Sequence, residues 1–113
     1  MLSEKEMLEI AERYLIKKNG SPNDVLVIIP QLTIKKPYGN IYNFNFKRYL
    51  ETGDFKYSVT GHAPFLVEKN RRRVVQFGTI DPLEDQLVEY ENRTMMGTMD
   101  TYWYPDEDRF SHK

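Results

Sequence analysis

The sequence predicts an α+β domain, in which an antiparallel β-sheet has an N-terminal helix and a C-terminal helix packed on one face. Three observations predict this fold. Apolar residues recur at helical spacing over residues 4–18, and aromatic residues alternate with polar ones over residues 42–46. Two apolar segments, 65–68 and 73–77, then precede a second helical pattern that begins at Asp81. The order helix, strands, hairpin, helix is typical of an antiparallel sheet covered by helices.

The first helix is expected over residues 4–18. Ser3 and Glu6 have the spacing of a capping box, in which each side chain accepts a hydrogen bond from the other residue's backbone N–H. Lys17 and Lys18 lie where cations stabilise the C-terminal end of a helix. One face is apolar and is expected to pack on the sheet; it comprises Met7, Leu8, Ala11, Tyr14 and Leu15.

The next segments predict strands. Residues 25–29 form a β-branched apolar run, typical of a strand buried on both faces, and Pro30 marks an edge or a bulge because it has no N–H to donate. Tyr42, Phe44 and Phe46 alternate with polar residues, which predicts one strand with an aromatic face. Residues 51–54 close it as a turn. Residues 55–62 are compatible with either a short helical turn or a loop.

A hairpin and a helix complete the predicted domain. The strands 65–68 and 73–77 are joined across residues 69–72. Asp81 is expected to be the N-cap of the following helix, with Pro82 at its first position. Leu83, Leu87 and Val88 give that helix its buried side. Residues 1–91 therefore form the predicted α+β domain, and residues 92–113 form a C-terminal extension, either an added strand that ends near Pro105 or a tail.

Composition limits the class of protein. The chain has 113 residues, 40% of them hydrophobic and 29% charged, as in a small globular domain. The absence of Cys excludes disulfides, thiolate metal sites and a cysteine nucleophile, and it fits a cytoplasmic location. The start of the sequence has no signal-peptide pattern, and no apolar run is long enough to cross a membrane. A net charge of -1 provides no overall field for nucleic acid.

No motif indicates catalysis, a cofactor or a metal. Glu51 and Asp54 form a carboxylate pair of the type used in acid–base chemistry, but no third polar group at a fixed spacing supports them, so a solvated turn is favoured. His62 belongs to no ligand or nucleophile motif and is interpreted as a structural loop residue. Arg71, Arg72 and Arg73 are interpreted as a solvated hairpin tip rather than a phosphate-binding site.

The extension offers the best candidate contact surface. Aromatic residues are enriched at interface hot spots, and acidic residues steer basic partners. The candidate residues are Tyr102, Trp103, Tyr104, Asp106, Glu107 and Asp108. Two interpretations stay open at this point. Either the aromatic residues contact a partner, or they pack on the sheet as an ordinary terminal strand. The two do not exclude each other, because an exposed terminal strand can pair with a partner.

Several of these segments together resemble the immunity protein 35 (YrhB-like) family of small bacterial domains. The resemblance spans roughly residues 4–91 and depends mainly on Arg48-Tyr49-Leu50-Glu51-Thr52-Gly53-Asp54 and Gly61-His62-Ala63-Pro64-Phe65-Leu66-Val67, followed by the hairpin, Phe77-Gly78-Thr79 and residues 82–90. Two features differ from the family pattern: Tyr42 stands where the family usually has Trp, and the hairpin turn lacks Gly.

The resemblance implies binding rather than catalysis. Proteins of this family are assigned as antidotes that bind and neutralise a cognate toxin domain in bacterial polymorphic toxin systems, and a related member is described as chaperone-like. The expected partner is therefore a toxin protein domain, with no cofactor, nucleic acid or membrane involved, and the chain itself is expected to be a monomer or a homodimer. The alternative is a chaperone-like or housekeeping protein that binds non-native clients.

Overall fold

The computed structural model describes residues 1–18, 25–57 and 63–112. Six strands form one antiparallel sheet in the order β2-β3-β5-β6-β7-β8, and two others, β1 and β4, form a separate ribbon. The strands are β1 (Leu26–Ile28), β2 (Ile34–Lys36), β3 (Gly39–Tyr42), β4 (Phe44–Phe46), β5 (Phe65–Glu68), β6 (Val74–Gln76), β7 (Tyr102–Tyr104) and β8 (Arg109–Ser111). The α-helices are α1 (Glu4–Lys18), α2 (Lys47–Thr52) and α3 (Leu83–Glu91), and short 3-10 turns span Pro30–Leu32 and Phe55–Tyr57. The predicted α+β class is confirmed.

Helix α1 has the predicted bounds and the predicted start. The Glu6 N–H donates to Ser3 Oγ at 3.1 Å, and the Ser3 N–H donates to Glu6 Oε1 at 3.0 Å, so the capping box is formed. The buried face differs from the prediction at two positions, because Ile10 is buried and Leu8 is 38% exposed. Leu8 instead borders a groove beside the helix.

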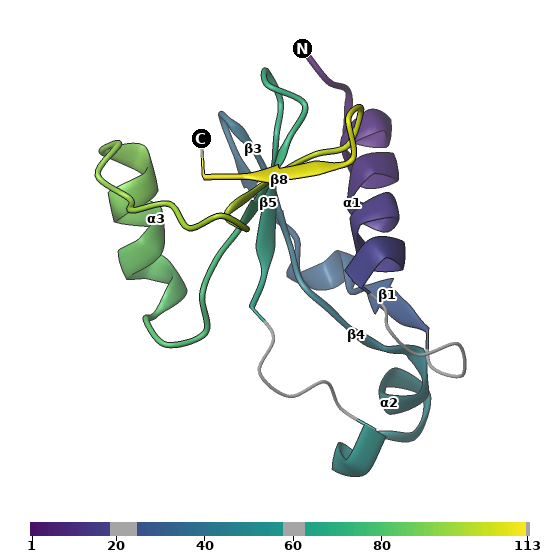
Figure 1. Cartoon of the computed structure of the whole chain (residues 1–113). Coiled ribbons are helices and arrows are strands. Elements are labelled where there is room, and N and C mark those ends of the chain that lie inside the picture. The colour runs from purple at the N-terminus through teal and green to yellow at the C-terminus, as the bar shows by residue number, and fades with distance from the viewer. Residues whose placement is uncertain (19–24, 58–62, 113) are drawn as a thin grey trace.

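The two long helices lie on opposite faces of the sheet, so the prediction that both cover one face is wrong (Figure 1). The reason lies in β5, where Phe65 and Val67 belong to the core beneath α1 and Leu66 belongs to the core beneath α3. Consecutive side chains of a strand point to opposite faces. All three are fully buried, so the sheet needs a cover on each side.

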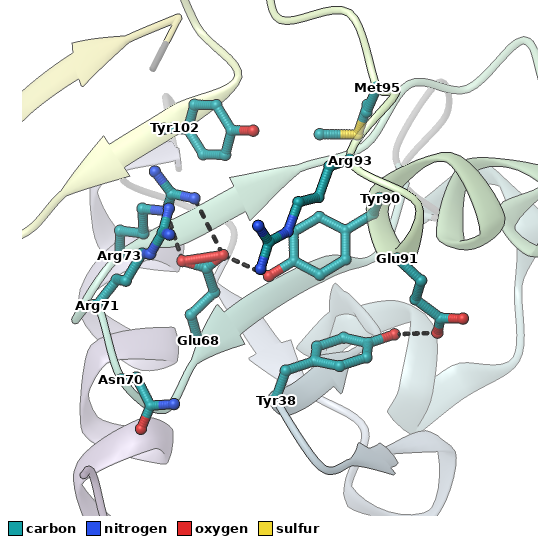
Figure 2. Close-up of a pocket in the computed structure, with 10 residues that line it drawn as sticks. All are labelled: Tyr38, Glu68, Asn70, Arg71, Arg73, Tyr90, Glu91, Arg93, Met95 and Tyr102. Atoms are coloured by element: carbon teal, nitrogen blue, oxygen red, sulfur yellow. Dashed lines mark hydrogen bonds and ion pairs between the residues drawn. The ribbon is translucent and has the colours of Figure 1, made fainter.

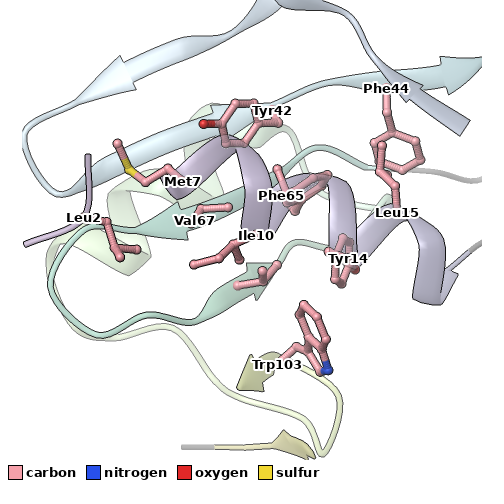
Figure 3. Packing of buried hydrophobic residues seen from close by; sticks show 12 residues of the cluster. Leu2, Met7, Ile10, Tyr14, Leu15, Tyr42, Phe44, Phe65, Val67 and Trp103 are labelled. Carbon is pink, nitrogen blue, oxygen red and sulfur yellow. The ribbon is translucent and has the colours of Figure 1, made fainter. Parts of the chain in front are cut away.

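The aromatic alternation over 42–46 is divided between two sheets. Tyr42 ends β3 in the large sheet, and Phe44 begins β4, which pairs with β1 in the ribbon. The prediction of one continuous strand is therefore wrong at Asn43, where the chain leaves one sheet for the other. Tyr42 and Phe44 nevertheless enter the same core, together with Phe65, as the alternation predicts (Figure 3). Strand β1 is only half-buried, so the prediction of a strand buried on both faces is wrong; its residues border an open groove beside α1.

Gly39 allows β3 and β5 to approach closely. It has a φ of 155° and lies directly opposite Glu68, and a Cβ at this position would lie 2.1 Å from the Val67 carbonyl oxygen. No other residue type fits there without moving the strand. The register that Gly39 permits places the Glu68 side chain on the face covered by α3.

Helices α2 and α3 start or end at positions that the sequence predicts only in part. Residues 51–54 were expected to form a turn, but residues 51 and 52 belong to α2, and Gly53 ends it at a φ of 70°. Helix α3 starts at Leu83 with Pro82 as the N-cap, one residue later than predicted. The Gln86 amide fixes this start, since its Nε2 donates to the carbonyl oxygens of Gly78 and Asp81.

The C-terminal extension adds two strands to the sheet. Strand β7 pairs with β6, placing Trp103 opposite Val74, and β8 pairs with β7 at the edge of the sheet. Trp103 is 3% exposed and contacts the Tyr14 ring of α1, with 5.8 Å between ring centroids (Figure 3). Residues 102–111 thus share the core with the rest of the sheet.

Candidate functional site

The aromatic residues predicted as a contact surface mainly support the fold. Trp103 is in the core beneath α1, and its Nε1–H donates to Asp108 Oδ1 at 3.0 Å. Tyr102 packs in the opposite core, and the Arg73 guanidinium lies over its ring at 4.0 Å. The Tyr104 hydroxyl accepts a hydrogen bond from Arg73 at 3.1 Å. Trp103 is therefore not an exposed contact residue; Tyr102 and Tyr104 are half-buried.

The three predicted acidic residues are exposed but paired within the chain. Their ion pairs join Asp106 to Arg72 at 3.0 Å, Glu107 to Arg109 at 2.5 Å and Asp108 to Lys17 at 2.9 Å. The hydrogen bond from Arg72 holds the pKa of Asp106 below its usual value, and the bonds from Lys17 and Trp103 do the same for the pKa of Asp108. Each acidic charge thus already has a cation beside it, which weakens the predicted attraction for a basic partner.

The structure instead places a pocket of about 530 Å³ on the α3 face of the sheet (Figure 2). We call it the arginine–tyrosine pocket. It is lined by Tyr38, Glu68, Asn70, Arg71, Arg73, Tyr90, Glu91, Arg93, Met95 and Tyr102. These residues come from the β2–β3 turn, the β5–β6 hairpin, the end of α3 and the segment after it, and β7, so the pocket forms only when these parts of the sheet come together.

A buried ion pair forms the base of this pocket. Arg73 donates to both carboxylate oxygens of Glu68, at 2.5 and 3.2 Å, and the two side chains are 8% and 6% exposed. The Tyr90 hydroxyl also donates to Glu68. Burial works to lower the pKa of Arg73, but the hydrogen bonds that Arg73 donates to Glu68 and Tyr104 outweigh it, so this pKa is raised. The guanidinium is therefore held charged and fixed.

The tyrosine side chains are fixed by their hydroxyl groups. Tyr38 donates to Glu91 Oε2 at 2.5 Å, and its ring lies 5.1 Å from that of Tyr90. Burial raises the pKa of both phenols above the ordinary value of 10, and the neighbouring carboxylates Glu91 and Glu68 raise it further. Because these hydroxyls stay protonated and already have acceptors, the two rings act as rigid walls of the pocket.

Two arginines of the pocket remain available. Arg71 and Arg93 are exposed, and neither forms an ion pair with any residue that the structure describes. Arg93 also has a φ of 62°, just after the end of α3. A left-handed conformation costs a non-glycine residue roughly 1–2 kcal/mol, and Gly or Asn is usual at this place. Arginine therefore occupies a position whose backbone conformation favours glycine.

A second concavity, which we call the α1 groove, lies beside α1 and has a volume of about 590 Å³. Its lining is mostly apolar, from Leu8, Leu15 and Ile16 of α1 to Leu26 and Ile28 of β1. Ile16 is 76% exposed. The groove also reaches Asn40, whose buried Oδ1 has no hydrogen-bond partner among the described residues.

Glu51 and Asp54, the predicted carboxylate pair, lie outside both concavities. Both residues are exposed near the end of α2, where Asp54 pairs with Lys56 at 3.7 Å. His62 lies outside the described residues. Among residues 1–18, 25–57 and 63–112, no three His, Cys, Asp or Glu side chains lie close enough together to hold a metal ion. No helix in these ranges is long and apolar enough to cross a membrane.

The sequence does not predict the arginine–tyrosine pocket, because the three consecutive arginines have different roles in the fold. The prediction of a solvated tip at residues 71–73 is wrong at Arg73, which is buried against Glu68, whereas the exposed Arg72 pairs with Asp106. Glu68 and Arg73 flank the hairpin turn, and Glu68 lies on the same sheet face as Leu66, the face that α3 covers with Tyr90. The sequence does contain one signal for this site: Glu68 and Arg73, of opposite charge, flank the predicted hairpin turn, a spacing that favours an ion pair between the two strands.

Comparison with known proteins gives one partial match. The chain is 38% identical over 53 residues to the uncharacterized protein YrhB of Escherichia coli (strain K12); the match covers 47% of this chain and 56% of YrhB. The chain thus spans little more than half the length of this relative. No family model matches the sequence, and no solved structure matches it.

Proposed function

We propose that this chain is a non-catalytic protein-binding domain, an immunity protein that binds and neutralises a cognate bacterial toxin domain. The observation that supports this most is the composition of the arginine–tyrosine pocket. Tyr, Arg and Met are enriched in protein interfaces, and hot spots are enriched in Tyr and Arg. The pocket combines three tyrosines, three arginines and Met95 on one concave surface. The motif resemblance described above supports the same class of function.

The chemistry of the pocket favours binding over acid–base catalysis. A general acid or base works best with a pKa near the operating pH. The pKa values of Tyr38 and Tyr90 are instead raised above that of an ordinary phenol. Glu68 is bound by Arg73 and Tyr90, and Glu91 by Tyr38. These groups hold one another in place, which suits a preformed binding surface.

Affinity capture followed by a growth assay tests this proposal. The tagged chain is expected to retain one protein in stoichiometric amount from its native cells. Expression of that protein alone is expected to arrest growth, and co-expression of this chain is expected to restore it. Capture of a stoichiometric partner whose expression leaves growth unchanged would contradict neutralisation. The neighbouring gene is a second, inexpensive check, since a large toxin-like reading frame directly upstream favours the immunity role.

The α1 groove favours a second candidate function, chaperone-like binding of non-native clients. Exposed apolar surface of this kind suits the apolar segments that unfolded chains expose. Suppression of aggregation of a chemically denatured model protein tests it. Under this alternative, Ile16→Ser in the groove is expected to weaken suppression, while Met96→Ser, another exposed apolar position, leaves it unchanged.

A further inference from the structure

We propose that the arginine–tyrosine pocket recognises a carboxylate side chain, an Asp or Glu on an exposed segment of the partner protein, through Arg71 and Arg93. This inference builds on the proposed function, because it names the chemistry by which the partner is recognised. Both arginines line the pocket, and in the view of Figure 2 their guanidinium groups lie on either side of the Glu68 carboxylate. Guanidinium groups bind carboxylates through paired, charge-assisted hydrogen bonds.

The charge of the pocket selects a single negative group. Three guanidinium groups and two carboxylates line it, from Arg71, Arg73 and Arg93 and from Glu68 and Glu91, which leaves a surplus of one positive charge. Arg73 already neutralises Glu68, and Tyr38 donates to Glu91. A monoanionic carboxylate matches this surplus, whereas a polyanion such as nucleic acid would bring more negative charge than the pocket neutralises.

The walls favour a peptide over a free inorganic anion. Met95 and the rings of Tyr38, Tyr90 and Tyr102 provide apolar surface around the arginines, suited to the aliphatic part of an acidic side chain and to its neighbours. The hydroxyl groups of Tyr38 and Tyr90 are already donating to carboxylates of the chain itself. Arg71 and Arg93 are thus charged donors of the pocket that remain available to an incoming anion.

The backbone at Arg93 gives independent support. Its left-handed conformation, with a φ of 62°, follows α3 directly, and the Arg93 N–H donates to the Tyr90 carbonyl oxygen at 3.1 Å. Glycine would adopt this conformation without strain. A strained non-glycine residue at a concave site is a recognised sign of function. The expected trade-off is that Arg93→Gly makes the fold more stable and ligand binding weaker.

The pocket is tested directly with short peptides and the chain of 113 residues. The probes are acetyl-Gly-Glu-Gly-amide, the matched acetyl-Gly-Gln-Gly-amide and inorganic phosphate, each titrated at millimolar concentration while amide NMR resonances are followed. The Glu peptide is expected to shift resonances of residues 69–73 and 90–95, and the Gln peptide is not. No response to the Glu peptide, an equal response to the Gln peptide, or stronger binding of phosphate would each overturn the proposal.

The variant Arg93→Gly separates recognition from folding. It is expected to raise the melting temperature and to weaken binding of the Glu peptide by about tenfold, the loss of one good charge-assisted contact. An unchanged peptide response in this variant would overturn the role of Arg93. The proposed function is tested separately. If wild type and variant capture the partner equally well, the proposed protein-binding function is retained and the proposal of a carboxylate site is contradicted.

Discussion

Arg73 and Glu68 form a two-point ion pair that is almost completely out of solvent, with N–O distances of 2.5 and 3.2 Å. The pair joins the two strands of the β5–β6 hairpin directly below the arginine–tyrosine pocket. Removing one partner of such a pair leaves a buried charge without compensation, which costs far more than the pair itself contributes. The pair therefore fixes both the hairpin and the base of the pocket.

Glu68→Gln is expected to reduce the free energy of unfolding by about 3–5 kcal/mol, because the charge of Arg73 stays buried without its counter-ion. Urea denaturation measures this change. The double variant Glu68→Leu with Arg73→Met is expected to recover most of the loss, since an apolar pair of similar volume needs no compensation. Equal stability of wild type and Glu68→Gln would show that the pair is not desolvated in solution.

Trp103→Ala is expected to cost about 3–5 kcal/mol of stability, because the indole fills the core between α1 and β7. Thermal unfolding followed by circular dichroism checks it. Met96→Ala is the control, since that side chain is 87% exposed and its truncation is expected to change stability by less than about 0.5 kcal/mol. A normal melting temperature for Trp103→Ala would contradict the buried position of Trp103 and restore it as a candidate contact residue.

Two glycine substitutions are expected to differ greatly. Gly53→Ala places a Cβ in open space at a φ of 70°, so the expected cost is only the left-handed strain of roughly 1–2 kcal/mol. Gly39→Ala adds a steric clash with the Val67 carbonyl and is expected to disrupt the β3–β5 pairing. Expression yield and chemical denaturation compare the two variants. Similar stability of both would mean that the strands do not approach as closely as the structure shows.

Asp108 makes part of the stability depend on pH. Its pKa is lowered in the folded state by the hydrogen bonds from Lys17 and Trp103, so folding favours the carboxylate form. This contribution is present above the unfolded-state pKa of about 4 and is lost as the pH falls through the lower folded-state value. Asp108→Asn is expected to melt below wild type at neutral pH, with the difference closing in strong acid. A difference that persists unchanged in acid would contradict the ion pair.

The sequence predicts an element well where residues close together in the chain determine it. The capping box at Ser3 and Glu6 predicts the start of α1, and the apolar segments on either side of residues 69–72 predict the hairpin. It fails where the outcome depends on distant packing. Nothing near Asn43 indicates that the chain changes sheets there, because that break is set by the pairing of β4 with β1.

The functional surface could be predicted only in part, for the same reason. Aromatic and acidic residues near the C-terminus have the composition of an interface, but their use is decided by partners far away in the sequence. Trp103 packs against Tyr14 of α1, and Asp106 forms an ion pair with Arg72 of the hairpin. The arginine–tyrosine pocket brings together residues from 38 to 102, an arrangement that needs the sheet topology.

The most direct test of the account is the affinity of the captured partner for three forms of this chain, measured by titration calorimetry. The forms are wild type, Arg71→Ala with Arg93→Ala, and the control Lys5→Ala with Lys47→Ala, which removes the same charge from exposed positions away from the pocket. All three are expected to be folded. The account predicts tight binding by wild type and control and a loss of about 2 kcal/mol or more for the arginine variant. Equal affinity of all three would contradict the pocket as the site of recognition.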